Sequence, residues 1–298
     1  MKSRLLYTTG NNKFEECDFI VPELKDGEIQ VKNIMTGVCR SDIDMMQGTF
    51  GPLPIHMQGH EGLGQVIKIG KGVTGVNLGD YVATRGEPAY SDFYNVRDTE
   101  YVVVPEASPK YILEPVACGI NVVMQCLDDI KKRSGKGKRL LILGSGFLAW
   151  IAYQTLEIKK LYFDIDVVGN SNKDRWKDTL KSDYSGTYDV IIDLSSHTYV
   201  FDCPVVNNEA LIIFGAQKQV TTDFGNLLWK ACTIIFPSPR TDKFHQCMML
   251  AEEWITKEQL NVDNFWTRGY NRNTEWSDAF TDGLNRKSGY SRGYIYWN

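Results

Sequence analysis

A chain of 298 residues exceeds the length that one hydrophobic core usually serves, so we expect two domains. Its 33 basic and 37 acidic side chains give a formal net charge of −4 without a long run of Lys or Arg, which argues against nucleic acid and anionic membranes as partners. No segment reaches the roughly 18 apolar residues of a membrane helix and no signal-peptide core follows the N-terminus, so we expect a cytoplasmic protein.

Up to about residue 117 the sequence consists of short strand-like runs broken by glycine and proline. The clearest are EIQVKNIMTGVC (28–39), GQVIKIG (64–70), DYVATRG (80–86) and EYVVVPE (100–106). Closely spaced β segments of this kind predict an irregular antiparallel or barrel-like β domain.

From residue 114 the pattern changes to α/β. Apolar residues recur at helical spacing over EPVACGINVVMQCLDDIKKR (114–133), and the run Leu140 to Leu143 reads as a buried parallel strand followed by a helix. Further buried strands are predicted in DIDVVGN (164–170), YDVIIDLSS (188–196), EALIIFGA (209–216) and CTIIFPSP (232–239). This alternation predicts a doubly wound parallel sheet, and the short spacing between 170 and 188 indicates that it is abridged. The tail from residue 276 reads as a helix followed by a strand.

A glycine turn joins the strand at 140–143 to the next helix. The sequence LILGSGFLA contains Gly144-x-Gly146-x-x-Ala149, in which the first glycine permits a tight turn and the second allows backbone to approach a pyrophosphate. Phe147 and Leu148 open the helix, whose N-terminus favours an anion. The strand, turn and helix together predict a dinucleotide site.

The end of the second strand bears on the choice between NAD and NADP. A carboxylate that reads the ribose is expected about twenty residues after the turn, but Gly169 and Asn170 stand there. Polar and basic side chains follow that could surround a 2′-phosphate: Ser171, Asn172, Lys173 and Arg175. The sequence therefore favours NADP(H) slightly over NAD(H), and the alternative is a solvated polar loop without a role.

Cys39, His60 and Glu61 offer a thiolate, an imidazole and a carboxylate, which are the ligand types of zinc. A catalytic zinc site needs three protein ligands and a fourth position open to water or substrate. The seven cysteines form no C-x-x-C pair, so a disulfide framework is not expected.

These motifs resemble the medium-chain dehydrogenase/reductase superfamily, of the zinc-containing alcohol, polyol and threonine dehydrogenase kind. The resemblance covers nearly the whole chain and is carried by GVCRSD, GHEGLGQVIKIGKGV, LGDYV, EYVVVPE, EPVACGI, LILGSGFLA and RKSGYSRGYIYW. It implies a GroES-like catalytic domain over 1–117 and 264–298, a Rossmann domain over 118–263, and a homodimer.

The resemblance also implies roles for single residues. Four positions match metal ligands of the superfamily, with Glu61 as a glutamate that binds or swings onto the ion and Glu114 at the third-ligand position: Cys39, His60, Glu61 and Glu114. Ser41 matches the hydroxyl that bonds the substrate oxygen and passes its proton outward. Arg40 and Arg292 fall where some members contact the cofactor pyrophosphate.

Two features depart from the superfamily pattern. Its separate structural zinc requires four closely spaced cysteines after GDYVATRG, and this chain has none there, so we expect one catalytic zinc and no structural zinc. Where some alcohol dehydrogenases carry a relay histidine, this chain has Asp44, which either relays a proton or caps a helix.

Two hypotheses on function follow. The first is a zinc-dependent oxidoreductase that transfers a hydride between NAD(P)(H) and an alcohol, polyol, sugar or sugar phosphate, or the matching carbonyl compound. The second is a degenerate relative that binds a dinucleotide without turnover, which the short loops motivate. The complete set of Cys39, Ser41, His60, Glu61 and Glu114 favours the enzyme.

Overall fold

The computed structural model describes residues 1–49, 51, 54, 57–176, 179–195, 205–216 and 224–297. They form two compact units, one of Met1–Ala117 with Met248–Asn298 and one of Cys118–Cys247. The division falls inside helix α7 (Phe244–Thr256), whereas the resemblance placed it at residue 264. No described helix has the length and apolar character that crossing a membrane requires.

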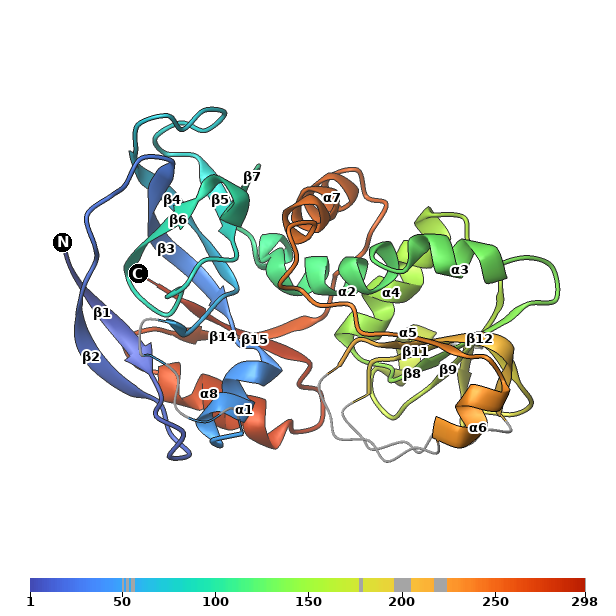
Figure 1. Ribbon diagram of the computed structural model, residues 1–298. Coiled ribbons are helices and arrows are strands. Elements are labelled where there is room, and N and C mark those ends of the chain that lie inside the picture. The colour runs from blue at the N-terminus through green and yellow to red at the C-terminus, as the bar shows by residue number, and fades with distance from the viewer. Residues whose placement is uncertain are drawn as a thin grey trace. The chain divides into compact units, whose positions relative to one another are not determined.

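The first unit is built on a seven-stranded sheet in the order β14-β15-β3-β4-β5-β7, with β6 pairing to β3 outside this path (Figure 1). All of these pairs are antiparallel except β14 with β15. The strands are β3 (Glu28–Gly37), β4 (Gly62–Ile69), β5 (Tyr81–Thr84), β6 (Phe93–Arg97), β7 (Tyr101–Val104), β14 (Trp266–Asn271) and β15 (Arg292–Tyr296). The four strand segments predicted before residue 117 are among them.

The C-terminal tail completes this sheet, because β15 pairs with β3 through Tyr294 opposite Gly37. The tail contributes the predicted helix α8 (Trp276–Asn285), which packs against α1 (Arg40–Met46). A separate hairpin, β1 (Lys2–Tyr7) with β2 (Glu15–Ile20), lies at the N-terminus. The tail thus lies beside the strand that leads into Cys39.

Three aromatic rings join these segments in one core. Phe14 stacks on Phe280 of α8 with ring centroids 3.7 Å apart, and Tyr90 meets both rings edge-on. Such pairs contribute roughly 0.5–1.5 kcal/mol each beyond the area they bury. Val38 and Ile43, on either side of Cys39, pack into the same cluster. The turn that carries Cys39 is therefore anchored to the core on both sides.

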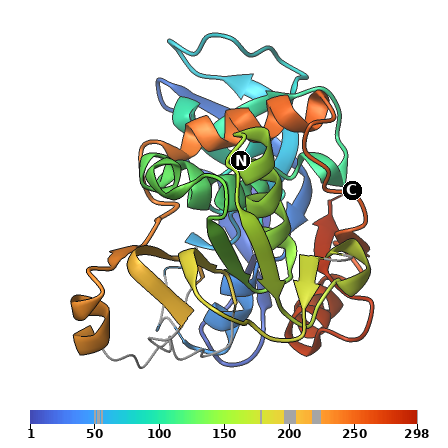
Figure 2. The same ribbon diagram turned by 90° about the vertical axis from the view of Figure 1, so that its right-hand side faces the viewer.

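The second unit contains a six-stranded parallel sheet in the order β10-β9-β8-β11-β12-β13, whose strands run side by side in Figure 2. The order reverses at β8, as in a Rossmann fold. The strands are β8 (Arg139–Leu143), β9 (Asp164–Val168), β10 (Leu180–Lys181), β11 (Tyr188–Asp193), β12 (Val206–Phe214) and β13 (Thr233–Ile235). The predicted fold class, a GroES-like β domain with a Rossmann sheet, is confirmed.

Helices cover both faces of this sheet (Figure 1). Alternate residues of β8 point to opposite sides, with Leu140 and Ile142 in one core cluster and Leu141 and Leu143 in the other. The first cluster is covered by α2 (Glu114–Met124), α3 (Leu127–Arg133) and α4 (Phe147–Ile158), and the second by α6 (Phe224–Trp229). Between β9 and β11 the described chain forms α5 (Lys173–Trp176), a single turn, as the short spacing predicted.

The segment 114–133, which has apolar residues at helical spacing, contains two helices. α2 ends at Met124 and α3 begins at Leu127, with Cys126 at φ −106° and ψ 9° between them. α3 has Asp128 and Asp129 in its first turn and three basic residues in its last, a distribution that matches the helix dipole. These charges favour a second helix start, which apolar periodicity alone does not reveal.

Candidate functional site

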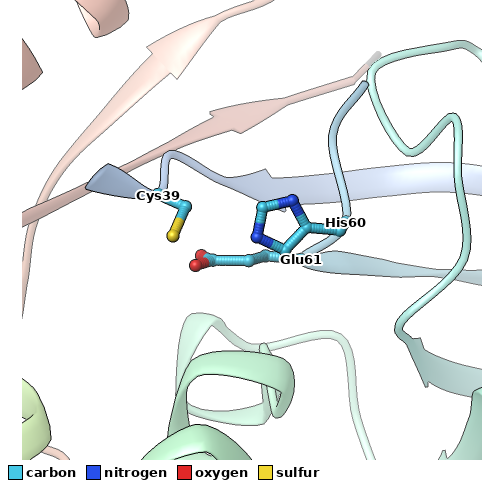
Figure 3. Close-up of side chains that lie close together, drawn as sticks. All are labelled: Cys39, His60 and Glu61. Carbon is cyan, nitrogen blue, oxygen red and sulfur yellow. The ribbon is translucent and has the colours of Figure 1, made fainter. Parts of the chain in front are cut away.

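Cys39, His60 and Glu61 converge at one end of the β3–β4 strand pair. Cys39 follows β3 and the His60–Glu61 pair precedes β4, and the two strands are antiparallel, so both segments reach the same edge. The Gly37 N–H donates to the Glu61 carbonyl at 2.9 Å, which fixes the approach. One ligand atom from each side chain lies within 4.8 Å of the other two, and the three groups point toward one another (Figure 3).

The chemistry of these three groups fits a zinc ion. Ligand atoms of a tetrahedral zinc lie about 3.5 Å apart, so a small inward movement of the three side chains would bring their ligand atoms to this spacing. Glu61 is fully buried, whereas Cys39 and His60 are half-buried. Within the part of the chain that the structure describes, this is the one group of at least three such side chains with ligand atoms so close.

Asp42 organises the turn on which Cys39 and His60 depend. Its Oδ2 accepts the Cys39 N–H at 2.8 Å and the Tyr90 hydroxyl at 2.7 Å, and its Oδ1 lies 3.7 Å from His60 Nδ1. The side chain is fully buried. Metal-binding histidines typically face a carboxylate with their other ring nitrogen, and this carboxylate sets the ring orientation. Asp42 is placed for that role.

Arg292 of β15 holds the Glu61 carboxylate. Its Nη2 donates to Oε1 at 2.6 Å and to Oε2 at 2.5 Å, and its guanidinium lies over the Trp266 ring. An added Cβ on Gly37 would overlap Glu61 Oε2, so glycine is required beside this carboxylate. The C-terminal strand thus supplies the counter-charge for a residue of the N-terminal sheet.

Burial and charge shift the pKa values of this cluster. Burial raises the pKa of the Cys39 thiol, and the Glu61 charge adds to the effect, while His60 opposes it. For His60, burial lowers the pKa, but the Asp42 and Glu114 carboxylates outweigh it and raise the value well above the ordinary one. A metal ion would have to displace both protons, so its affinity depends on pH.

The glycine turn after β8 has the geometry of an anion cradle. Gly144 adopts φ +105°, and an added Cβ would lie 3.1 Å from the Leu194 backbone, so only glycine fits. At Gly146, which caps α4, the nearest atom to an added Cβ is Ser171 Oγ at 3.9 Å. The side of Gly146 that a Cβ would fill is thus open, next to the first-turn N–H groups of a twelve-residue helix.

The loop after β9 is bonded to this turn. Ser145 Oγ donates to the Ser171 carbonyl at 2.6 Å and accepts the Ser171 N–H at 2.9 Å. Asn172 Nδ2 and Trp176 Nε1 both donate to the Ser145 carbonyl. Ser171 and Asn172 therefore support the turn, and their contact with a 2′-phosphate stays a prediction.

Comparisons with known proteins agree with this architecture. Residues 25–110 match the alcohol dehydrogenase GroES-like domain. D-arabitol-phosphate dehydrogenase of Enterococcus avium is 24% identical over 94% of this chain and 93% of its own length. These matches support the medium-chain dehydrogenase/reductase superfamily that the sequence motifs predicted. An alcohol dehydrogenase of Schizosaccharomyces pombe is 28% identical, but the match spans about half of each chain, 46% of this one and 47% of the relative.

The likeness in fold to solved structures extends over the whole chain. The structure of S. aureus TarJ in complex with NADPH superposes with a TM-score of 0.80 at 17% identity, covering 100% of both chains. At this identity the likeness shows the fold alone.

Two further residues of the superfamily pattern lie near the Cys39 cluster. Ser41 is half-buried in the first turn of α1, two residues after Cys39. Glu114 is the first residue of α2 and is buried, but among the described residues it is outside the group of three with ligand atoms within 4.8 Å. Its Oε1 lies 3.9 Å from Arg85 Nε.

Arg40 lies on the outer side of α1, where its Nε donates to Asp44 at 2.9 Å. Asp44 is therefore paired with Arg40, and Asp42, rather than Asp44, closes the first turn of the helix. Burial lowers the pKa of Arg286, and the charges of Arg40 and Arg292 add to this effect.

In the second unit, the remaining candidates flank the glycine turn. Gly146 caps α4, and Phe147 and Leu148 begin it. Beyond Asn170, Lys173 is exposed at the start of α5, and the Arg175 guanidinium lies over the Trp150 ring, 5.1 Å from its centroid. Of the basic residues predicted to face a 2′-phosphate, Lys173 is the more exposed.

Sequence reasoning missed three residues around the candidate metal ligands: Asp42, Tyr90 and Arg85. Asp42 had a usable signal, because an acidic residue three positions after a helix N-cap commonly closes the first turn. Tyr90 and Arg85 had none, since their distance from Cys39 and Glu114 in sequence reveals nothing until the sheet brings them together.

Proposed function

We propose that the protein is a zinc-dependent oxidoreductase that transfers a hydride between NAD(P)(H) and an alcohol, polyol, sugar or sugar phosphate, or the matching carbonyl compound. The observation that carries the proposal is the convergence of Cys39, His60 and Glu61. A second, independent support is the glycine turn of the Rossmann sheet, with its open side at Gly146.

The roles of the chain's own residues follow from their positions. Cys39, His60 and one of the two glutamates, Glu61 or Glu114, would hold the ion, with Asp42 keeping the His60 ring in place. When bound, zinc supplies Lewis acidity toward the substrate oxygen and the nicotinamide supplies the hydride partner. In the alcohol-to-carbonyl direction, the hydroxyl proton must leave.

Ser41 is our candidate for moving that proton. It is half-buried on the first turn of α1, two residues from Cys39, so a group bound near the Cys39 cluster would lie beside its hydroxyl. A serine Oγ can accept the substrate proton while donating its own to solvent. Asp44, which is paired with Arg40, is not needed for this step.

For the cofactor, we propose a slight preference for NADP(H). No carboxylate follows β9 at the ribose position, where Gly169 and Asn170 stand, and the nearby Lys173 is exposed. The first turn of α4 would receive the pyrophosphate, as helix N-termini do. Structures of similar fold are known with NADPH and with NADH, so the preference rests on the residues of this chain alone.

For the substrate, we propose a polyhydroxy compound or its phosphate. Glu114 stands where the polyol-dehydrogenase branch of the superfamily has its glutamate, and the relative that aligns with nearly the whole chain is named for D-arabitol phosphate. A panel of alditols, sugar alcohol phosphates and simple alcohols would identify the class.

The test combines metal analysis with a cofactor assay. We expect one zinc per chain, and a change in the absorbance of the reduced nicotinamide with a polyol-type substrate and NADP(H). The competing hypothesis is a non-catalytic dinucleotide-binding relative, which the single-turn connection α5 between β9 and β11 favours. Zinc-free protein that binds NADP(H) and transfers no hydride after zinc is supplied would leave only that hypothesis.

We also propose that the protein is a homodimer. Four large apolar side chains, three on α6 and one directly after β13, are more than two-thirds exposed: Phe224, Leu228, Trp229 and Phe236. Exposed large apolar side chains are candidates for an interaction surface. Light scattering on the eluting protein would show twice the 33.9 kDa chain mass if two copies associate, and the single-chain mass if they do not.

A further inference from the structure

Tyr90 lies between the two segments that carry Cys39 and His60. It is fully buried, and its ring packs against Gly59, the residue before His60, where an added Cβ would lie 2.6 Å from Tyr90 Cγ. Its hydroxyl donates at 2.7 Å to Oδ2 of Asp42, three residues after Cys39. The ring thus contacts the His60 segment, and the hydroxyl contacts the Cys39 segment.

The Tyr90 hydroxyl bears on which oxygen of Asp42 faces His60. Oδ2 accepts two bonds, one from the Tyr90 hydroxyl and one, at 2.8 Å, from the Cys39 N–H. Oδ1 is buried, has no hydrogen-bond partner among the described residues, and lies 3.7 Å from His60 Nδ1. Because two donors from separate segments hold the same oxygen, the carboxylate cannot turn without breaking one of these bonds. Its other oxygen is therefore kept toward the imidazole.

A second acceptor lies near the Tyr90 hydroxyl but is the weaker competitor. The hydroxyl oxygen is 3.2 Å from the Gly37 carbonyl oxygen, compared with 2.7 Å from Asp42 Oδ2. A tyrosine hydroxyl has one proton to donate, and its bonds to carboxylates are shorter and stronger than its bonds to neutral carbonyls. The proton is therefore donated to Asp42.

Other contacts hold the Tyr90 segment without the hydroxyl. The neighbouring Ala89 N–H donates to the Gly59 carbonyl at 2.9 Å. The Tyr90 ring meets Phe14 and Phe280 edge-on, with centroid distances of 5.7 and 5.4 Å. A phenylalanine at position 90 would keep these contacts, so the effect of the hydroxyl on the site can be measured separately.

We infer that Tyr90 is a positioning residue of the proposed zinc site, because its hydroxyl fixes the Asp42 carboxylate with Oδ1 toward the His60 ring. This inference rests on the proposed function. Carboxylate partners of metal-binding histidines set the ring orientation and raise its basicity, and loss of such outer partners lowers metal affinity about 10–100-fold. Tyr90 is one bond further from the ion than Asp42, so its effect should lie at the lower end of this range.

The test is the zinc dissociation constant, measured by competition with a chelating dye. We expect Tyr90→Phe to bind zinc about tenfold more weakly than the unmodified protein. Tyr270→Phe is the matched control, because Tyr270 is a fully buried tyrosine of the same core cluster, and its hydroxyl donates to Asp282 at 2.8 Å. Asp282 is on α8 and is paired with Arg268. The zinc affinity of Tyr270→Phe should stay within about twofold of the unmodified value.

A general loosening of the core would affect both tyrosine variants alike, whereas a positioning role affects only Tyr90→Phe. Each variant loses one hydroxyl–carboxylate bond, so thermal unfolding of the zinc-free proteins should shift by a similar amount in both. With Co²⁺ in place of zinc, the visible absorption of the bound ion should change in Tyr90→Phe and stay unchanged in Tyr270→Phe. Equal loss of zinc affinity in the two variants, or an unchanged affinity in Tyr90→Phe, would overturn the inference.

A double variant shows whether the hydroxyl acts through Asp42. Asp42→Ala should weaken zinc binding, and adding Tyr90→Phe should bring no further loss, because the carboxylate that the hydroxyl holds is gone. An equal further loss would mean that the hydroxyl acts by another route, which overturns the inference. If Asp42→Ala does not fold, Asp42→Asn takes its place, and Tyr90→Phe should then cost less affinity than it does in the unmodified protein.

The two proposals can fail separately. If the unmodified protein binds zinc but Tyr90→Phe and Tyr270→Phe bind it equally well, the zinc site stands and the role of Tyr90 is wrong. If the unmodified protein binds no zinc at micromolar concentration, the proposed function and this inference are both wrong.

Discussion

Substitution of Cys39 separates the proposed metal binding from the stability of the fold most clearly. It stands between a strand and a helix whose flanking residues Val38 and Ile43 are in the aromatic core, so the turn does not depend on the thiol for its stability. We expect Cys39→Ala to lose bound zinc and all activity while its thermal unfolding stays close to that of the unmodified protein.

Cys17→Ala is the control for this variant, because Cys17 is a half-buried cysteine of β2 with no part in the cluster. It should keep both zinc and activity. An active Cys39→Ala protein without metal would remove Cys39 from the site.

Ser41 lies two residues from Cys39 and is not among the proposed metal ligands, so its loss should separate metal binding from turnover. We expect Ser41→Ala to retain one zinc per chain while kcat falls about 10²–10⁴-fold, the usual contribution of a positioned proton-transfer group. The deficit should be largest at low pH in the alcohol-oxidising direction, where proton removal is hardest. Unchanged turnover would exclude Ser41 from the relay.

In the glycine turn between β8 and α4, Gly144 and Gly146 have different roles, and two substitutions can distinguish them. Gly144→Ala places a side chain at φ +105° against the Leu194 backbone, so we expect the free energy of unfolding to fall by about 1–3 kcal/mol. Gly146→Ala meets no protein atom closer than 3.9 Å. It should leave stability nearly unchanged.

The cost of Gly146→Ala should instead appear in cofactor binding. A methyl group on the open side would occupy the place of the pyrophosphate, so we expect the NADP(H) dissociation constant to rise about tenfold or more, equivalent to about 1.4 kcal/mol. Fluorescence titration with NADPH measures it, and chemical denaturation of the same protein gives the stability. Equal effects of the two substitutions on NADPH binding and stability would contradict this division of roles.

Along the whole chain, the sequence predicted those features that are determined by residues close together in sequence. The strands of both sheets and the turn at Gly144 follow from periodicity and glycine placement, and the residues of GVCRSD and GHEGLG identified the metal-ligating candidates. The bonds that support the site could not be predicted in the same way. Arg292 reaches Glu61 across 231 positions of sequence, and this pairing exists only because β15 returns to β3.

The break between α2 and α3 is a second feature that the periodicity of the sequence does not predict, although it involves residues close together in the chain. Apolar residues continue through 114–133 with helical spacing, so periodicity predicts one helix, while the charges of α3 favour a new start at Leu127. The role of the loop after β9 is a further case, since Ser171 and Asn172 bond to Ser145 in addition to any ligand they meet. Polar residue types indicate binding, but only the fold shows which partner they already have.

The most direct test of the proposed zinc site is the X-ray absorption spectrum of zinc bound to the unmodified protein. Convergence of Cys39, His60 and a glutamate predicts one zinc per chain with a single sulfur neighbour at about 2.3 Å and nitrogen or oxygen neighbours at about 2.0–2.2 Å. The sulfur signal should disappear in Cys39→Ala and persist in Cys17→Ala. A spectrum without sulfur, or with several sulfur neighbours, would contradict the metal site on which the proposed function depends.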